Sequence, residues 1–231
     1  MANFDDHCTV QAAAKHVLRL LGPTLVATDT EATIATRAVR LLASEGITDT
    51  WYYDCPAFVL LGSRSCLSIS GRDYVPNHEP VGDTNLVTVD LSPVFNGAWG
   101  DCARSFAIEG GAYVSQPQAD ELQEGFVAEA VLHKAMRTFE SPATTFDELF
   151  VFGNAELMRL GFENLDLHAN LGHSIASQRE SRIYIEAGNH RPLGSVSLFT
   201  FEPHIRKVGG VWGFKYENIY FFDSKNRVNA L

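Results

Sequence analysis

Asp90 is a carboxylate within an apolar stretch, residues 86–91, that has the composition of a buried strand. Burying an unpaired carboxylate costs several kcal/mol, so Asp90 requires a partner. The next strand begins near Asp101, and the turn between the two strands contains Asn96-Gly97. In one register Asp90 lies opposite Asp101, and in the other it lies opposite Ala103 and diagonal to Asp101. Both registers place the two carboxylates on one face of the hairpin.

Three more ionisable residues lie in otherwise apolar surroundings. His173 follows a glycine, Glu202 ends an aromatic strand, and Glu217 interrupts another strand. Alone, such a histidine is most often a satisfied core residue, and such a carboxylate is most often an edge residue or half of a salt bridge. As a set, four carboxylates and one imidazole are hard oxygen and borderline nitrogen donors. They are enough to hold two divalent cations.

The elements that must position these residues follow a doubled order, helices and then strands. A capping box at Thr28-x-x-Glu31 and a stop at Gly46 bound one of the helices. Helices are predicted over 10–21, from that capping box to about 45, 118–139 and 146–160. Strands are predicted over 57–61, 67–70, 86–91, 104–109, 183–185, 195–202 and 215–222. This grouping indicates an α+β protein with a mainly antiparallel sheet covered on one face, and the doubling indicates two related halves.

Composition and charge exclude several classes of protein. Apolar residues make up 45% of the 231 residues, which excludes a disordered chain. Eighteen basic and 28 acidic side chains give a net charge of −10, which argues against nucleic acid or an anionic membrane as a partner. The four cysteines form no CxxC pair and are expected to be reduced, and no secretory signal or membrane span is recognisable. We therefore expect a cytoplasmic protein.

The ordered set Asp, Asp, His, Glu, Glu resembles the pita-bread metalloenzymes, a family that includes methionine aminopeptidase, aminopeptidase P, prolidase and creatinase. The aspartates are eleven residues apart, as in that family, and the second opens an Asp-x-x-Arg motif that ends at Arg104. The other matching motifs are Gly172-His173, Phe201-Glu202-Pro203 and Tyr216-Glu217-Asn218. The resemblance implies a pita-bread fold, in which two pseudo-symmetric ααββ halves form a curved, mainly antiparallel sheet covered by helices. It also implies one catalytic domain over residues 1–231, without the extra N-terminal domain of aminopeptidase P or creatinase.

The same resemblance implies a dinuclear site that takes Mn, Fe, Co or Zn. Asp90, Asp101 and Glu217 would share one ion, and Asp101 and Glu217 would bridge to a second ion completed by His173 and Glu202. Two such ions lower the pKa of a bound water and polarise a carbonyl. Glu202 would take the proton of that water and deliver it to the leaving nitrogen. The implied activity is hydrolysis of an amide or related C–N bond in a small peptide, as in an aminopeptidase or dipeptidase.

Two histidines that bind substrate in the family's peptidases are replaced here by Asp73 and Glu180. His78 is a candidate substitute, or else a solvated loop histidine. His204 is a candidate catalytic group that holds an oxyanion or shuttles a proton. Because a carboxylate accepts hydrogen bonds where an imidazole can donate them, the exchange predicts a changed substrate. The alternative function is a non-peptidase metalloenzyme of the same fold that acts on a small amino-acid-like molecule. A catalytically silent binding module is a third reading, against which the five ligands argue.

Aromatic residues near these segments are predicted to shape the substrate pocket. Tyr53 precedes the first strand, and Trp99 lies in the hairpin between the two aspartates. Ordinary core packing is the alternative for both. Arg104 is expected to neutralise nearby carboxylates. The sequence leaves the identity of the ions, the substrate and the oligomeric state open, with a homodimer among the options.

Overall fold

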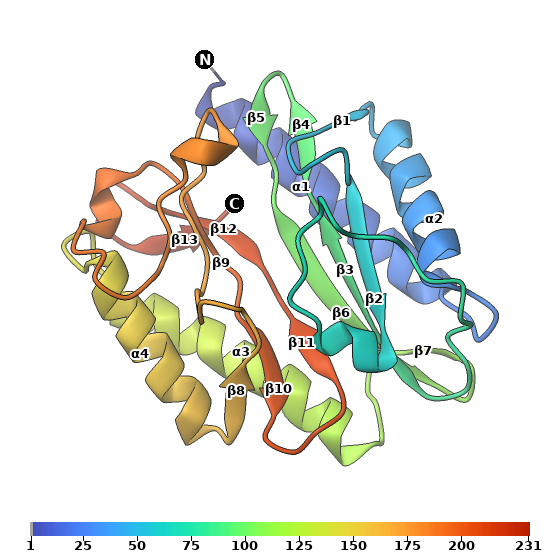
Figure 1. Cartoon of the computed structure of the whole chain (residues 1–231). Helices are drawn as coiled ribbons and strands as arrows, with labels where there is room; N and C mark the ends of the chain where they lie inside the picture. The colour runs from blue at the N-terminus through green and yellow to red at the C-terminus, as the bar shows by residue number, and fades with distance from the viewer. Residues whose placement is uncertain (1) are drawn as a thin grey trace.

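The computed structural model describes residues 2–231 and consists of two halves with a similar order of elements (Figure 1). The first half contains α1 (Phe4–Leu21), α2 (Glu31–Ser44), β1 (Asp49–Thr50), β2 (Ala57–Leu61), β3 (Asn85–Leu91), β4 (Pro93–Phe95), β5 (Ala98–Trp99), β6 (Cys102–Glu109) and β7 (Ala112–Val114). The second half contains α3 (Asp120–Phe139), α4 (Phe146–Arg159), β8 (Phe162–Asn164), β9 (Phe199–Phe201), β10 (His204–Lys207), β11 (Gly213–Lys215), β12 (Asn218–Phe222) and β13 (Val228–Ala230). The strands of the described chain pair antiparallel in each sheet, which confirms the predicted α+β class.

The helices begin and end where local chemistry satisfies their free backbone groups. α1 begins six residues before the predicted start, because Asn3 and Asp6 form a capping box there. α2 and α4 end just before Gly46 and Gly161, as predicted. These glycines have φ values of 78° and 80°, which the left-handed end of a helix requires.

The capping residue of α2 is Thr30, so the predicted capping box at Thr28 is wrong. The Thr30 side chain accepts a hydrogen bond from the backbone N–H of Thr33, and the Thr33 side chain closes the box. Glu31 is not available as a capping partner, because its buried carboxylate pairs with Arg64 and accepts backbone N–H groups of other segments. The helix therefore starts two residues later than the sequence motif suggested.

The strands predicted in the first half at 57–61, 86–91 and 104–109 are confirmed, and the other predicted strands form in part or not at all. Residues 57–61 form β2 as predicted, and β3 and β6 each extend slightly beyond their predicted bounds. The predictions at 67–70 and 183–185 are wrong: the first segment runs along a cavity without a ladder partner, and the second makes only an isolated bridge. Only residues 199–201 of the strand predicted at 195–202 form a strand. Glu217 lies in a break between β11 and β12.

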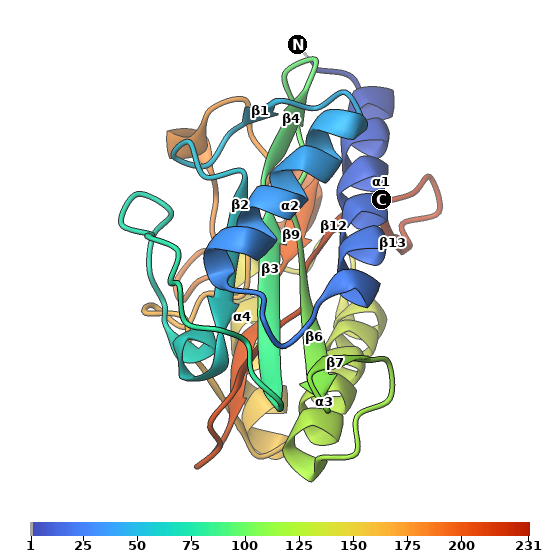
Figure 2. The same cartoon turned by 90° about the vertical axis from the view of Figure 1, so that its right-hand side faces the viewer.

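Apolar cores fix the central strands against the helices. α1 and α3 lie on the same side of β3 and β6 (Figure 2). In the first half Val17 and Ile34 pack with Val89 of β3, and in the second half Phe146 packs in a cluster with Phe201. Because side chains alternate along a strand, Asp90 points to the face opposite Val89. That opposite face carries the ionisable residues.

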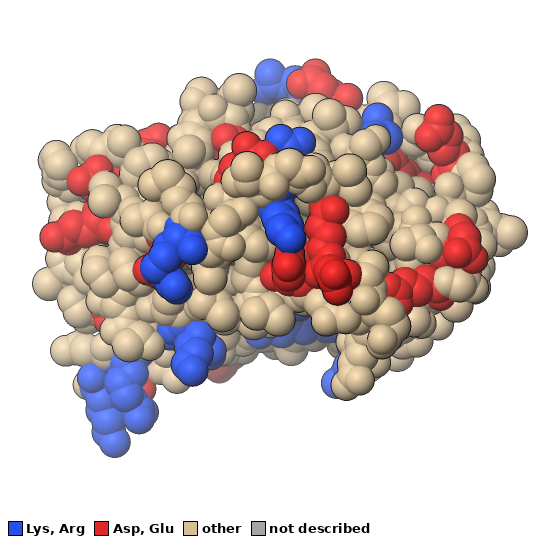
Figure 3. All heavy atoms as spheres, turned by 90° about the horizontal axis from the view of Figure 1, so that it is seen from below, with Lys and Arg blue, Asp and Glu red and all other residues tan. Residues whose placement is uncertain are grey.

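The surface carries both acidic and basic side chains. On the face shown in Figure 3 they are interspersed, without one continuous basic patch. All four cysteines are free thiols. Among residues 2–231, no helix has the length and apolar character that a membrane crossing requires.

Candidate metal centre

The β3–β6 pair brings the two aspartates together in the second of the two registers considered above. Asp90 lies opposite Ala103, two residues after Asp101, so both carboxylates are on one face. The connecting hairpin turns at Asn96-Gly97, where both residues have positive φ values that suit a tight hairpin turn. Gln11 of α1 is fully buried and holds the backbone of Asp101: its amide donates to the carbonyl at 2.8 Å and accepts the N–H at 2.9 Å.

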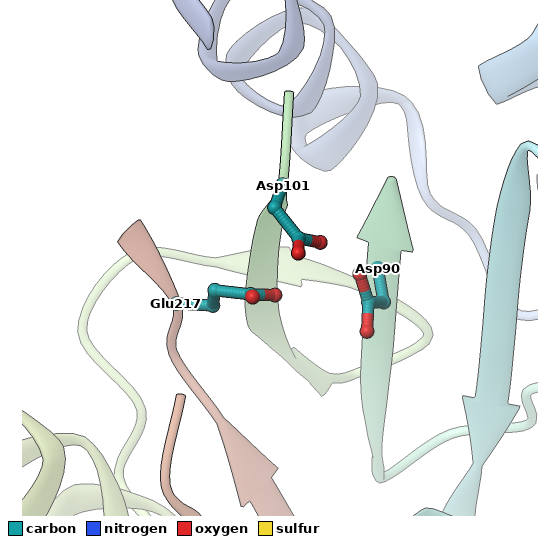
Figure 4. A group of neighbouring side chains, drawn as sticks. All are labelled: Asp90, Asp101 and Glu217. Carbon is teal, nitrogen blue, oxygen red and sulfur yellow. The ribbon is translucent and has the colours of Figure 1, made fainter. Parts of the chain in front are cut away.

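Glu217 reaches the aspartates from the other half of the molecule (Figure 4). One carboxylate oxygen from each of Asp90, Asp101 and Glu217 lies within 4.8 Å of the other two. The backbone of Glu217 is fixed to β6, because its N–H donates to Ala103 and its carbonyl accepts from Arg104 at 2.6 Å. Arg104 therefore orients the backbone of Glu217, whereas the sequence suggested that it neutralises carboxylates.

His173 and Glu202 complete the cluster because the backbone at Gly172 passes close to the backbone at Thr200. Gly172 has a φ of 140°, and a Cβ there would lie 2.4 Å from the carbonyl oxygen of Thr200. The Thr200 hydroxyl accepts the N–H of His173 at 2.9 Å and donates to the Glu202 carboxylate at 3.2 Å. The Nε2 atom of His173 lies 3.5 Å from oxygens of both Asp101 and Glu202.

The ring of His173 presents a lone pair to these carboxylates. Its Nδ1 atom lies 3.0 Å from the carbonyl of Ser174, which can only accept, so Nδ1 carries the proton. Burial lowers the pKa of His173 to about 4, which keeps the ring neutral near pH 7. A neutral imidazole with its Nδ1–H bonded to a carbonyl is the form in which histidine binds a metal ion.

The buried carboxylates of this cluster have the chemistry of a cation site. Oδ2 of Asp101 and both carboxylate oxygens of Glu217 are buried without a hydrogen-bond partner. Burial, followed by the neighbouring carboxylates, raises the pKa of both groups well above the usual range. Buried oxygens normally have partners, and these lack one. Four oxygen donors and one nitrogen donor fit a divalent ion, and the residues present are suited to hold such a group.

Lys215 of β11 is a member of the cluster that the sequence analysis did not select. Its ammonium lies 2.5 Å from the nearest Asp90 oxygen, 3.2 Å from Glu202 and 3.9 Å from Glu217. Burial alone would lower the pKa of this ammonium, but the facing carboxylates, Asp90 first, raise it well above the usual range. The sequence held a signal for it: Lys215 is two residues before Glu217, and such residues share a face of an extended chain.

A cavity of about 230 Å³ opens onto the cluster. Arg182 lines it, with its guanidinium 3.3 Å from His173 Nε2 and close to the rings of Trp51 and Tyr184. A larger cavity of about 1270 Å³ lies between α1 and α3 and is lined by a different set of side chains, with Lys215 common to both. The smaller cavity contains the ionisable cluster, so we assign the site to it.

His204 lines the small cavity, but its ring is committed to a backbone contact. Its Nε2 atom lies 2.6 Å from the carbonyl of Ser65, so Nε2 carries the proton. Burial lowers the pKa of His204 to about 4. The ring is neutral and only its Nδ1 lone pair remains, so it can accept a hydrogen bond but cannot donate one to an oxyanion.

The other predicted substrate residues are not among those that line the cavity. Asp73 and His78 are exposed, and His78 lies beside α2. Glu180 is 72% exposed and pairs with Arg179. Tyr53 stacks against Arg179 at the surface, and Trp99 lies behind Trp51, with parallel rings whose centroids are 4.8 Å apart. The loops carry three of these residues away from the carboxylates.

Comparison with known proteins identifies the family of this chain. The model of metallopeptidase family M24 matches residues 7–223. The chain belongs to this family. Its membership confirms the resemblance drawn from the five motifs, and the family is one of metallopeptidases. A comparison with curated proteins finds no match.

Solved structures match the M24 chain over nearly its whole length. X-Pro aminopeptidase from Thermotoga maritima matches with a TM-score of 0.81 and 18% identity, over 98% of this chain and 59% of its own. Prolidase from Pyrococcus furiosus matches with a TM-score of 0.77 and 16% identity, over 100% of this chain and 64% of its own. Methionine aminopeptidase from Thermotoga maritima matches with a TM-score of 0.76 and 14% identity, over 98% of this chain and 94% of its own.

These matches confirm the predicted pita-bread fold. At such low identity they establish the fold alone. The chain spans less than two thirds of the X-Pro aminopeptidase and the prolidase, and nearly all of the methionine aminopeptidase.

Proposed function

We propose that this chain is a metal-dependent hydrolase of an amide or related C–N bond, with an aminopeptidase-like or dipeptidase-like activity. The observation that carries the proposal is the convergence of buried, unpartnered carboxylate oxygens with a neutral imidazole nitrogen at one small cavity. In the proposal two divalent ions, Mn, Fe, Co or Zn, are held by Asp90, Asp101, His173, Glu202 and Glu217. Bound there, they would supply a water of lowered pKa and polarise the carbonyl under attack.

Glu202 is the proposed proton carrier. Its side chain is 19% exposed and faces the cavity, whereas Glu217 is fully buried. Although burial alone would raise the pKa of Glu202, the positive charge of Lys215 outweighs it and lowers this pKa. An ionised Glu202 can take a proton from water and return it to the leaving nitrogen. His204 is proposed to accept a hydrogen bond from a substrate N–H group.

The cavity favours a small substrate that carries a carboxylate. Its volume of about 230 Å³ is below the roughly 300–1,000 Å³ of sites for drug-sized ligands. Arg182 lines the cavity, and a guanidinium suits bidentate pairing with a carboxylate. A dipeptide with a free carboxyl end meets both conditions. The small volume also favours the second candidate, a non-peptidase metalloenzyme acting on an amino-acid-like molecule.

The wider setting of the enzyme is also proposed. Residues 1–231 act as one catalytic domain in the cytoplasm, without nucleic acid or membrane as a partner. The net charge of −10 supports the absence of nucleic acid and anionic membrane as partners, because it disfavours binding to polyanions. The oligomeric state is open, with a homodimer among the options.

A peptide panel tests the proposed activity. Mn²⁺-loaded protein is incubated with Xaa-Pro and Met-Ala dipeptides and with their C-terminal amides. We expect cleavage of the free acids over the amides, its loss in Glu202→Gln, and a raised KM in Arg182→Gln. The exposed Arg159→Gln is the matched control, and Asp73→His and Glu180→His should also cleave like the unmodified protein. Protein that binds ions but cleaves no member of the panel contradicts the peptidase and favours the second candidate.

A further inference from the structure

Lys215 is directed into the ionisable cluster by the alternation of side chains along β11. Its neighbour Phe214 is fully buried in the core of the second half, and its other neighbour Tyr216 stacks with Arg104. The backbone of Lys215 is paired on both sides, with His204 of β10 and with the hydroxyl of Ser105 on β6. The ammonium therefore cannot be moved away by a change of strand register, only by rotation of its own side chain.

The ammonium lies at one end of the cluster, not at its centre. Its shortest contact is with Asp90, and it also faces Glu202 and Glu217. His173 lies at the other end, where its Nε2 atom faces Asp101 and Glu202. At the Asp90 end the ammonium is in direct contact with carboxylates. At the His173 end the nearest cation is the guanidinium of Arg182, which lies 3.3 Å from His173 Nε2 and forms no ion pair with the carboxylates of the cluster.

A second cation at the Asp90 end must share oxygens with this ammonium. Divalent ions bind carboxylate oxygens at about 2.0–2.2 Å. The Asp90 and Glu217 oxygens that would supply such contacts lie 2.5 Å and 3.9 Å from Nζ. Two divalent ions balance the charge of four carboxylates, which would leave the ammonium unpaired among cations. The lysine stem is flexible and its side chain is 21% exposed, so it has a route out of the cluster.

We propose that Lys215 is an internal cation of the site, which stabilises the metal-free cluster and competes with a divalent ion for the Asp90 end. The two ions then bind with unequal affinity: the ion at the His173 end binds tightly, and the ion at the Asp90 end binds only when the lysine side chain is displaced. This inference rests on the proposed dinuclear function and refines it.

The test measures ion binding without any activity assay. Chelator-treated protein is titrated with Mn²⁺ by calorimetry, bound ions are counted by elemental analysis, and melting is followed in EDTA. We expect two affinities in the unmodified protein that differ at least tenfold. Lys215→Met should raise the weaker affinity at least tenfold and lower the melting temperature in EDTA by several degrees. Lys215→Arg should keep both properties, and Lys134→Met, which removes an exposed lysine of α3, should change neither.

Each outcome separates this inference from the proposed function. If Lys215→Met binds Mn²⁺ as the unmodified protein does, the inference is overturned, whatever the peptide panel shows. If Lys215→Met does not stay folded in EDTA, the same titration is made with Lys215→Gln, for which the same gain in the weaker affinity is expected. Unequal affinities that depend on Lys215, in a protein that cleaves no peptide, support the inference and contradict the peptidase.

Discussion

Replacement of Gln11 by methionine is expected to destabilise the candidate metal centre, because Gln11 holds the backbone of Asp101 in place. Gln11 is fully buried in α1, and its amide pairs with both backbone groups of Asp101, at 2.8 and 2.9 Å. Methionine has a similar length and shape but pairs with neither group. Gln11→Met therefore removes two hydrogen bonds and leaves the N–H and the carbonyl of Asp101 buried without partners.

The size of the effect follows from those two groups. An unsatisfied buried polar group costs about 1–3 kcal/mol, so two of them cost about 2–6 kcal/mol of the free energy of unfolding. For a chain of this length 1 kcal/mol shifts the melting temperature by about 2–4 °C, which gives a decrease of about 4–24 °C. Because Asp101 is a proposed ligand, the Mn²⁺ affinity should also fall by about tenfold or more.

Thermal unfolding in EDTA and Mn²⁺ titration measure the two effects. Gln123→Met is the matched control, because Gln123 is exposed on α3 and its amide makes one hydrogen bond, to Gln118. The control should change the free energy of unfolding by no more than about 0.5 kcal/mol. A Gln11→Met protein with the melting temperature and Mn²⁺ affinity of the unmodified protein would refute the assignment of Gln11 as the support of Asp101.

Further predictions concern the buried carboxylates and the close approach at Gly172. Glu217→Gln should raise the melting temperature in EDTA and abolish the rise that Mn²⁺ causes, because the amide bears no charge. Because the pKa of Glu217 is raised in the folded state, its protonated carboxyl group contributes stability below the unfolded-state pKa of about 4.3. This contribution is lost as the pH rises toward the raised folded-state pKa. Metal-free unmodified protein should therefore lose stability relative to Glu217→Gln as the pH rises above about 4.3; parallel pH profiles would contradict this. Gly172→Ala should lower stability by more than about 2 kcal/mol and weaken Mn²⁺ binding through His173, since its Cβ meets Thr200. The control Gly188→Ala, with φ of 79° and open space, should cost only about 1–2 kcal/mol of backbone strain and leave Mn²⁺ binding unchanged, so equal effects on binding would contradict the account.

The side-chain alternation of a hairpin is what made part of the site predictable. Asp90 and Asp101 share a face in either register, so their proximity did not depend on the turn. His173 and Glu202 come from different segments, and their proximity depends on the close approach at Gly172, which no local pattern encodes. Only the order of motifs shared with a family pointed to them.

The misplaced residues lie mainly on loops. Asp73, His78 and Glu180 are exposed, and their positions depend on loop paths that periodicity does not describe. Lys215 was missed for another reason. Its strand was predicted, and Lys215 shares a face with Glu217 by the same alternation. A lysine ammonium is not a donor to metal ions, so the pattern of carboxylate and imidazole donors did not include it.

Anomalous diffraction from crystals grown with Mn²⁺ tests the central claim most directly. The account predicts two peaks about 3.5–4 Å apart in the small cavity, in contact with Asp90, Asp101, His173, Glu202 and Glu217. The peak at the Asp90 end should weaken first as the Mn²⁺ concentration is lowered. Saturating Mn²⁺ that leaves this cavity without a peak, or that gives peaks only at other residues, would contradict the account.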